Sequence, residues 1–135
     1  MYKTLIVLLL LITSISADDL NWEKDLETAF SKATKQNKAV MIMVESSSCP
    51  WCIRMKERTL NDDNILERLD QFVLVKIDRD SVKTNYIPYA KYVPTIYFMT
   101  KEKKILERIT GYFGVLDFNS WIDDVEKKLA KIKKQ

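Results

Sequence analysis

The sequence of 135 residues contains no histidine and only two cysteines, Cys49 and Cys52. A structural zinc site takes four ligands, usually cysteine and histidine, so an intramolecular zinc site is nearly excluded. Two cysteines build no disulfide scaffold, and a domain of this length with 47% hydrophobic residues buries its own core without one. We therefore expect neither a bound metal ion nor a separate cofactor.

A strong charge of either sign is absent too. The formal net charge at pH 7 is +3, and the basic residues are spread along the chain apart from those near the C-terminus. Nucleic-acid-binding domains usually carry a concentrated basic patch, so nothing in the sequence points to a nucleic-acid partner. Internal repeats and low-complexity linkers are lacking as well. We expect one globular domain, present as a monomer.

The N-terminal residues form a separate pattern. Residues 1–3 supply a positive charge, residues 5–12 are an unbroken apolar run, and residues 13–17 are mostly small. This pattern is typical of a secretory signal peptide, and the run is shorter than the roughly 20 residues that span a bilayer. We expect cleavage near Ala17, which leaves a domain of residues 18–135 in the periplasm or otherwise secreted, without membrane contact. An uncleaved anchor is the alternative.

The two cysteines are three positions apart in the stretch SSSCPWC at residues 46–52. A short apolar run precedes this stretch, and apolar residues at helical spacing follow it, so Cys49 is expected at a strand-to-helix junction. A Cys-x-x-Cys pair in this setting is typical of thiol–disulfide redox chemistry. An inert structural disulfide is the alternative, but a bridge closing so small a loop stabilises a fold only weakly.

The expected helix N-terminus gives the two thiols different roles. Unpaired backbone N–H groups and the helix dipole favour a thiolate at Cys49, which makes it the attacking nucleophile. Pro50 suits the first helical turn, where its missing N–H costs nothing. Cys52 lies one turn deeper and becomes the resolving thiol that attacks the mixed disulfide. Trp51 offers an aromatic rim against which a partner can dock.

The rest of the chain alternates between helical and strand patterns. Helices are predicted over residues 21–37, 53–69 with a break near 59–63, 86–90 and 115–134. Strands are predicted over residues 39–45, 72–78, 93–99 and 104–109. The cap of the first helix is expected at Asp18, Asp19 or Asn21. The nearly continuous apolar character of residues 39–45 indicates a central strand covered on both faces.

This order of elements resembles the thioredoxin family over nearly the whole chain after residue 17. The likeness rests on the redox motif after a buried strand, the sequence Val93-Pro94-Thr95 at the place of the family's cis-proline loop, the hairpin strand at residues 104–109, and Gly111 before the last helix. Residues 56–62 and 108–113 are most similar to small periplasmic members such as SoxW-type proteins and the C-terminal domain of the DsbD-type reductase. The resemblance implies an α/β thioredoxin fold, with a central mixed sheet of four to five strands flanked by helices.

The resemblance also implies roles for further residues. It implies a cis peptide bond between Val93 and Pro94 that faces the sulfurs and exposes backbone groups to a substrate strand. Thioredoxins usually place a buried aspartate six residues before the first cysteine, where this chain has Met43. Glu45, on the same strand face, is a candidate replacement as proton acceptor, and Lys76 matches the lysine that often accompanies the aspartate. The alternative for Glu45 is a solvated residue at the strand end.

The sequence therefore predicts an extracytoplasmic thiol–disulfide oxidoreductase that cycles Cys49 and Cys52 between dithiol and disulfide. The family likeness favours reduction of protein disulfides, with an upstream electron donor that could be a membrane reductase. The lack of histidine removes a donor that stabilises the thiolate of strong oxidants, so we expect a potential nearer to the reducing thioredoxins. The alternatives are an oxidant or isomerase of the same fold, and a non-catalytic module that binds client proteins.

Overall fold

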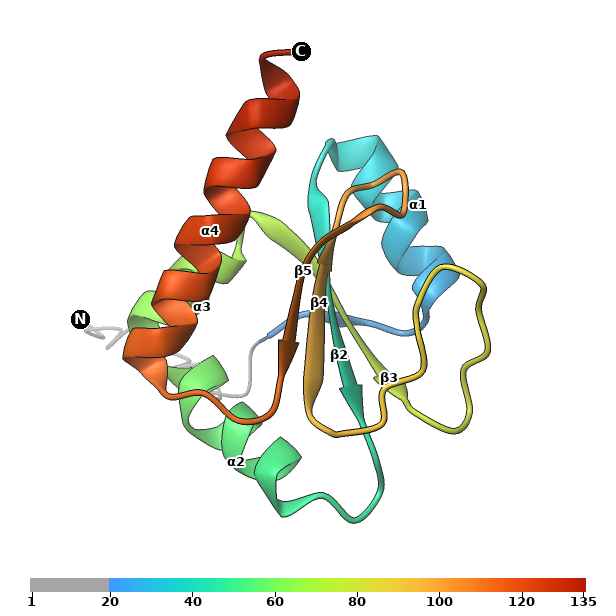
Figure 1. Ribbon diagram of the computed structural model, residues 1–135, viewed down its shortest axis with the longest axis vertical. Coiled ribbons are helices and arrows are strands. Elements are labelled where there is room, and N and C mark those ends of the chain that lie inside the picture. Colours follow the sequence, from blue (N-terminus) through green and yellow to red (C-terminus); the bar gives the residue numbers. More distant parts are fainter. Residues whose placement is uncertain (1–19) are drawn as a thin grey trace, which may run out of the picture.

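The computed structural model describes residues 20–135, and the predicted signal peptide at residues 1–17 lies outside them. The described chain folds as a five-stranded mixed sheet with helices on both faces (Figure 1). The strand order across the sheet is β1-β3-β2-β4-β5. The elements in chain order are β1 (Trp22–Glu23), α1 (Leu26–Gln36), β2 (Ala39–Glu45), α2 (Pro50–Glu57), the 3₁₀ turn η1 (Thr59–Asn61), α3 (Asp63–Leu69), β3 (Phe72–Asp78), β4 (Thr95–Met99), β5 (Ile105–Thr110) and α4 (Val115–Lys133).

The central strand β2 determines where the redox motif lies. It pairs in parallel with β3 and antiparallel with β4, and residues 39–44 are all buried. Successive side chains alternate between the two faces. Met41 and Met43 pack in the layer that contains α2, α3 and α4, while Ile42 packs in the layer that contains α1. The prediction of a central strand covered on both faces is confirmed.

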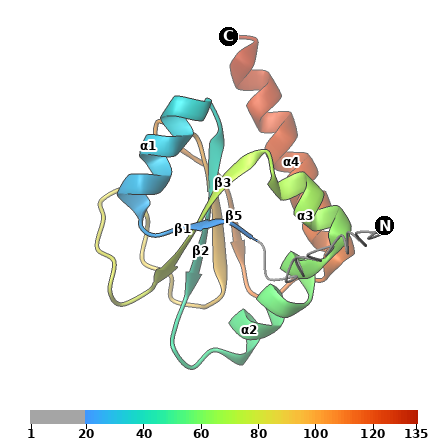
Figure 2. The same ribbon diagram turned by 180° about the vertical axis from the view of Figure 1, so that it is seen from behind.

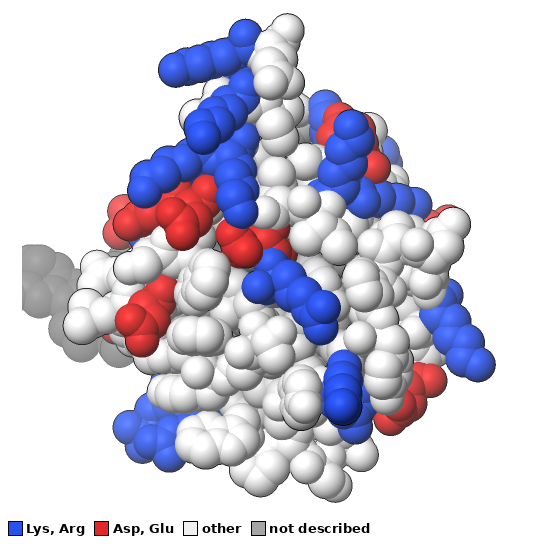
Figure 3. Space-filling view, viewed as in Figure 1, with Lys and Arg blue, Asp and Glu red and all other residues white. Residues whose placement is uncertain are grey.

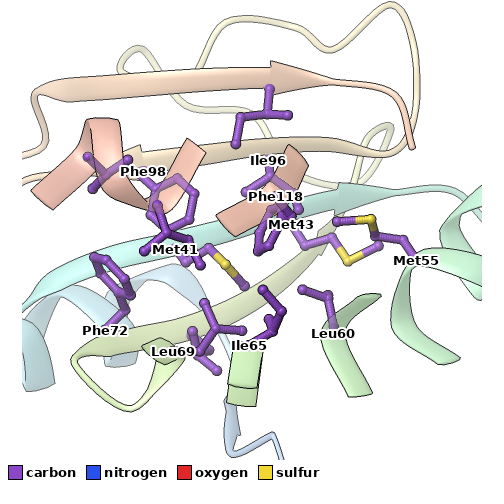
Figure 4. Packing of buried hydrophobic residues seen from close by; sticks show 14 of the residues in the cluster. Met41, Met43, Met55, Leu60, Ile65, Leu69, Phe72, Ile96, Phe98 and Phe118 are labelled. Carbon is purple, nitrogen blue, oxygen red and sulfur yellow. The ribbon is translucent and has the colours of Figure 1, made fainter. Parts of the chain in front are cut away.

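Figure 2 shows the sheet from behind, with α1 on the face opposite to α3 and α4. The layer between the sheet and α2, α3 and α4 is rich in methionine and phenylalanine (Figure 4). The Phe98 ring lies 5.0 Å from the Phe72 ring and 6.3 Å from the Phe118 ring. Met55 of α2 is fully buried in the same layer. Each buried side chain of this size contributes about 1.5 to 3 kcal/mol on removal from water, so α2 is held firmly against the sheet.

The first helix begins later than predicted. Residues 21–25 are not helical, because Trp22 and Glu23 form β1 and pair in parallel with β3. The N-cap of α1 is Asp25, whose carboxylate accepts a hydrogen bond from the Thr28 N–H at 2.7 Å. The expected caps at Asp18, Asp19 and Asn21 were therefore wrong. The strand β1 was missed because it is only two residues long and is formed by its pairing with β3, which leaves no local pattern in the sequence. The predicted end of the helix is confirmed, since Asn37 is the C-cap with φ of 53°.

The predicted break in the active-site helix is confirmed. The chain leaves α2 at Glu57, passes through η1 and starts again as α3. Asp62 is the N-cap of α3, and its carboxylate accepts hydrogen bonds from the N–H groups of Asn64 and Ile65 at 3.0 and 3.3 Å. An aspartate in this position satisfies backbone donors that a continuous helix would use internally, so it favours a new helix start.

The predicted helix at residues 86–90 is wrong, because this segment is part of an irregular loop. Pro88 lies in its middle, and proline disfavours the helical conformation of the residue before it. The loop is held by the Tyr97 hydroxyl, which donates to the Pro88 carbonyl at 3.2 Å, and by the Arg79 guanidinium, which donates to the Lys91 carbonyl at 3.1 Å. A phenol is protonated at neutral pH, so this group is a donor there, and burial raises the pKa of Tyr97 further above its ordinary value.

The C-terminal third agrees closely with the sequence prediction. β4 and β5 form the expected antiparallel hairpin, although β4 begins at Thr95 because Pro94 has no N–H to contribute to the ladder. Gly111 follows β5 with φ of 97°, a conformation that glycine adopts readily. The closing helix α4 covers the sheet with Phe118 and Ile122. Within residues 20–135 no helix combines the length and apolar character needed to cross a membrane.

Candidate redox site

The redox motif lies at the N-terminus of α2. Cys49 is the N-cap residue, with extended backbone, and its Sγ accepts a hydrogen bond from the Cys52 N–H at 3.1 Å. Pro50 occupies the first turn of the helix, as predicted. The N–H group and the positive end of the helix dipole both stabilise negative charge on Cys49 Sγ. This is the arrangement that a nucleophilic thiolate needs.

Cys49 and Cys52 are joined by a disulfide, with their Cα atoms 5.2 Å apart. Both residues belong to the core cluster beneath α2, where Cys52 is 1% exposed and Cys49 is 6% exposed. The more accessible member of the pair is therefore the N-terminal cysteine. Attack on an external disulfide requires an accessible sulfur, so this difference agrees with the predicted roles of nucleophile and resolving thiol, which stay predictions.

The peptide bond between Val93 and Pro94 is cis, as the resemblance implied. The loop around it is fixed by two hydrogen bonds: the Gly111 N–H donates to the Pro94 carbonyl at 2.8 Å, and the Thr95 hydroxyl donates to the Tyr92 carbonyl at 2.6 Å. The Val93 side chain packs against the cluster that contains both cysteines. No partner within residues 20–135 hydrogen-bonds the Val93 backbone, which leaves it free to pair with an extended peptide.

Glu45 at the end of β2 forms an ion pair with α2 itself. The Lys56 Nζ lies 2.8 Å from the Glu45 Oε2, and the two side chains are 31% and 22% exposed. Lys56 is four residues after Cys52, which places the two on the same side of the helix. Met43, at the place of the usual aspartate, is fully buried with Met41. A carboxylate and an ammonium group thus lie together at the edge of the apolar layer around the disulfide.

Lys76 of β3 pairs in the sheet with Met43 of β2, and its side chain contacts an aromatic ring. Its Nζ lies 5.1 Å from the centroid of the Trp22 ring, which is a cation–π distance. Lys76 and Lys56 both line a cavity of about 140 Å³ between β1, β3 and the segment from the end of α2 to α3. Among the described residues Glu45 is ion-paired with Lys56 and not with Lys76. The electrostatic role assigned to Lys76 from the resemblance stays a prediction, and the structure adds Lys56 as the direct partner of Glu45.

An exposed aromatic rim lies beside the disulfide. Trp51 is 54% exposed, and its ring lies 5.5 Å from the ring of Tyr112, which follows β5. The Arg54 guanidinium lies 5.6 Å from the Trp51 centroid and 5.7 Å from the Tyr112 centroid. The spacing of three residues between Trp51 and Arg54 on one helix could have predicted their contact. The contact with Tyr112 had no local signal, because it depends on how the chain returns after β5.

In the described part of the chain, no three histidine, cysteine, aspartate or glutamate side chains are close enough together to hold a metal ion. A disulfide at a helix N-terminus, beside a cis-proline loop and on a five-stranded α/β sheet, defines a protein of the thioredoxin fold with a thiol–disulfide redox site.

Comparison with known families agrees with this class. A family model described as thioredoxin-like matches residues 21–101, and the chain belongs to that family. Among curated proteins it is similar to anterior gradient protein 3 of Mus musculus, with 24% identity over 126 residues that cover 87% of this chain and 76% of the relative. It is also 24% identical to anterior gradient protein 2 of Xenopus laevis, where the match covers 87% of this chain but only 64% of the relative. The chain thus spans about two thirds of that second protein.

Solved structures share the fold. A thioredoxin from Thermus thermophilus superposes with a TM-score of 0.66 at 22% identity, covering 78% of this chain and 86% of that chain. A protein described as DsbH oxidoreductase superposes with a TM-score of 0.63 at 19% identity, covering 80% of this chain and 85% of that chain. The reduced periplasmic thioredoxin SoxS from Paracoccus pantotrophus superposes with a TM-score of 0.58 at 14% identity, covering 68% of this chain and 99% of that chain. At these identities the likeness shows the thioredoxin fold.

Proposed function

We propose that this protein is an extracytoplasmic thiol–disulfide oxidoreductase that reduces disulfides in other proteins. The observation that carries the proposal is the position of Cys49, whose Sγ lies at the N-terminus of α2 and accepts the Cys52 N–H at 3.1 Å. The free backbone of Val93 supports it, because a substrate strand that pairs there lies next to the disulfide.

The reaction runs in two exchange steps. The Cys49 thiolate attacks one sulfur of the substrate disulfide, which breaks that bond, forms a mixed disulfide and releases the other substrate sulfur as a thiolate that takes a proton. Cys52 then loses its proton and attacks Cys49 Sγ, which releases the second substrate thiol and leaves the Cys49–Cys52 disulfide. The two electrons come from the dithiol pair. An upstream dithiol donor, such as a membrane reductase, restores it.

The proton of Cys52 needs an acceptor, and Glu45 is the proposed one. It lies on the same face of β2 as Met43, which occupies the place of the usual aspartate, and the ion pair with Lys56 holds its carboxylate against α2. When the proton moves from Cys52 to Glu45, the negative charge moves with it to the sulfur, and the Lys56 ammonium on the same side of α2 stays as a positive charge that favours the thiolate. Lys76 of β3, which lines a cavity together with Lys56, would add a second positive charge on this side of the sheet.

The location outside the cytoplasm rests on two supports. Residues 1–17 have the pattern of a secretory signal peptide. SoxS, which shares the fold, is described as a periplasmic thioredoxin. Disulfides persist in that compartment, so a disulfide reductase has substrates there. Fractionation of cells that express the full chain, with N-terminal sequencing of the recovered protein, checks both the compartment and cleavage near Ala17.

The direction of electron flow is tested by equilibration with glutathione. A strong oxidant needs a reduced form whose thiolate is greatly stabilised, and the chain has no histidine that could stabilise the Cys49 thiolate. We expect the disulfide to resist reduction by glutathione buffers and to equilibrate with the more reducing thioredoxin couples. Ready reduction by glutathione would instead make the protein an oxidant or isomerase.

Turnover separates the enzyme from a module that only binds client proteins. Wild-type protein with a dithiol donor should catalyse reduction of insulin disulfides, and Cys49→Ser should abolish it. Ser48→Ala, which changes the exposed neighbour of Cys49 and removes no thiol, is the matched control and should retain activity. Equal rates for wild type and Cys49→Ser would support the binding module and refute the enzyme.

A further inference from the structure

Arg54 presents a positive charge beside the disulfide that the redox chemistry described above does not use. Its guanidinium lies against the rings of Trp51 and Tyr112, at 5.6 and 5.7 Å from their centroids. No carboxylate of residues 20–135 forms an ion pair with it. In Figure 3 basic side chains project over α2 at the lower left of the visible face, and white residues separate them from the acidic side chain above.

The aromatic contacts fix the guanidinium without using its hydrogen-bond donors. A guanidinium group that packs on a ring keeps the N–H groups at its edge directed away from the ring. These donors match the two oxygens of a carboxylate, which they can bind at once. Trp51 directly precedes the resolving Cys52 in sequence, so the docked guanidinium lies at the rim of the redox site.

None of the other charged side chains on the described segments around the disulfide forms an ion pair with Arg54. Glu45 is ion-paired with Lys56, and Lys91, in the loop before Pro94, lies over the Tyr92 ring at 5.5 Å. Residues 111–116, which return past the site after β5, contain no charged side chain. Glu57 and Arg58 at the end of α2 carry opposite charges, Asp117 lies in the first turn of α4, and Lys76 lies on β3.

We propose that Arg54, held by Trp51 and Tyr112, selects substrates by binding a carboxylate on an acidic residue next to the cysteine that Cys49 attacks. This inference rests on the proposed function and narrows its substrate class to disulfides in acidic segments. Arg54 is a specificity-determining residue, whereas Cys49 and Cys52 perform the exchange. An aspartate or glutamate within a few residues of the attacked sulfur would reach the guanidinium while the segment pairs with Val93.

A different role for Arg54 would leave another signature. If its charge mainly stabilised the Cys49 thiolate, its removal would slow exchange with every disulfide to the same degree. If it binds a substrate carboxylate, the loss depends on the substrate. The two roles are therefore separated by the ratio of kcat/KM between substrates that differ in one charge.

The test uses the full mature chain and three peptide disulfides that differ only in the residue beside one cysteine, which is Glu, Gln or Lys. Wild type should prefer the Glu peptide over the Gln peptide by about fivefold in kcat/KM, as expected for one carboxylate contact at a solvent-accessible site. Arg54→Gln should reduce that ratio to about one. Arg54→Lys should keep part of it. Raising the ionic strength should weaken the preference of wild type.

Arg58→Gln is the matched control. It removes the same charge four residues further on, where no aromatic ring of the described chain lies under the guanidinium, and should leave the Glu-to-Gln ratio unchanged. Thermal unfolding of each variant shows whether it folds, and the ratio within one variant does not depend on its active fraction. Equal rates of wild type on all three peptides, or an equal loss on all three in Arg54→Gln, would overturn the inference alone. If wild type reduced none of the three peptides, both this inference and the proposed function would be overturned.

Discussion

The ion pair between Glu45 and Lys56 connects the central strand to the active-site helix, and its strength can be measured. The Nζ and Oε2 atoms are 2.8 Å apart, and the side chains are 31% and 22% exposed. At an effective dielectric constant of about 20, two unit charges at this distance attract by about 6 kcal/mol. Desolvation and side-chain ordering offset most of that. Exposed pairs contribute about 0.2 to 1 kcal/mol, and breaking a buried pair costs about 3 to 5 kcal/mol.

A pair of this intermediate burial should have a coupling energy of about 1 to 2 kcal/mol, between those two classes. The measurement is a double-mutant cycle with Glu45→Gln, Lys56→Met and the double variant, each unfolded by urea with the disulfide intact. Both single variants should be less stable than wild type. The double variant should lose less than the sum of the two losses, by the coupling energy.

The exposed pair between Lys127 and Asp124 on α4 is the matched control. Its charged atoms are 3.6 Å apart and its side chains are 73% and 50% exposed, so the same cycle should give less than about 0.5 kcal/mol. A coupling of Glu45 and Lys56 no larger than this control would show that the carboxylate is not held by Lys56. The proposed positioning of Glu45 under α2 would then be refuted.

Glu45→Gln should slow release of the mixed disulfide by at least about tenfold, because it removes the proton acceptor for Cys52, and a quenched-flow assay that finds the wild-type rate would exclude that role. Gly111→Ala should lower the free energy of unfolding in urea by about 1 to 2 kcal/mol. The cause is the backbone φ of 97°, because no atom lies within 4 Å of the added methyl group. Gly114→Ala, at a φ of −72°, should change the free energy of unfolding by less than about 0.5 kcal/mol, and equal effects of the two substitutions would contradict this. Hydrogen bonds from Thr28 lower the pKa of Asp25 below its usual 3.8, so its stabilisation of α1 should be present at neutral pH and lost as the pH falls through the folded-state pKa. The difference in Tm between wild type and Asp25→Asn should therefore shrink in acid, and a difference independent of pH would contradict this assignment.

The fold and the centre of the site could be predicted because their signals are local. The apolar run of β2, the amphipathic pattern of α4 and the position of Cys49 after a strand each lie within one segment of sequence. The cis bond before Pro94 was predicted from family likeness and not from the local pattern.

The features that were missed depend on contacts between distant segments. β1 is two residues long and exists because Trp22 and Glu23 pair with β3. The segment at residues 86–90 has helical apolar spacing, but Pro88 and the hydrogen bond from Tyr97 hold it as a loop. The partner of Glu45 could not be identified from sequence, since long side chains from several elements could reach it. The same limit applies to the contact between Arg54 and Tyr112.

The most direct test of the central claim is to trap the exchange reaction between this protein and its substrates. Removal of the resolving thiol in Cys52→Ala leaves a mixed disulfide on Cys49 without an internal route to release. The full chain carrying this change, expressed with its N-terminal residues and alkylated on lysis, should accumulate covalent adducts that a reductant dissolves, and mass spectrometry should locate the bond at Cys49. The variant with both cysteines replaced by alanine should give none. Adducts on Cys49→Ala but not on Cys52→Ala would reverse the two roles, and the absence of adducts from both single variants would contradict the account.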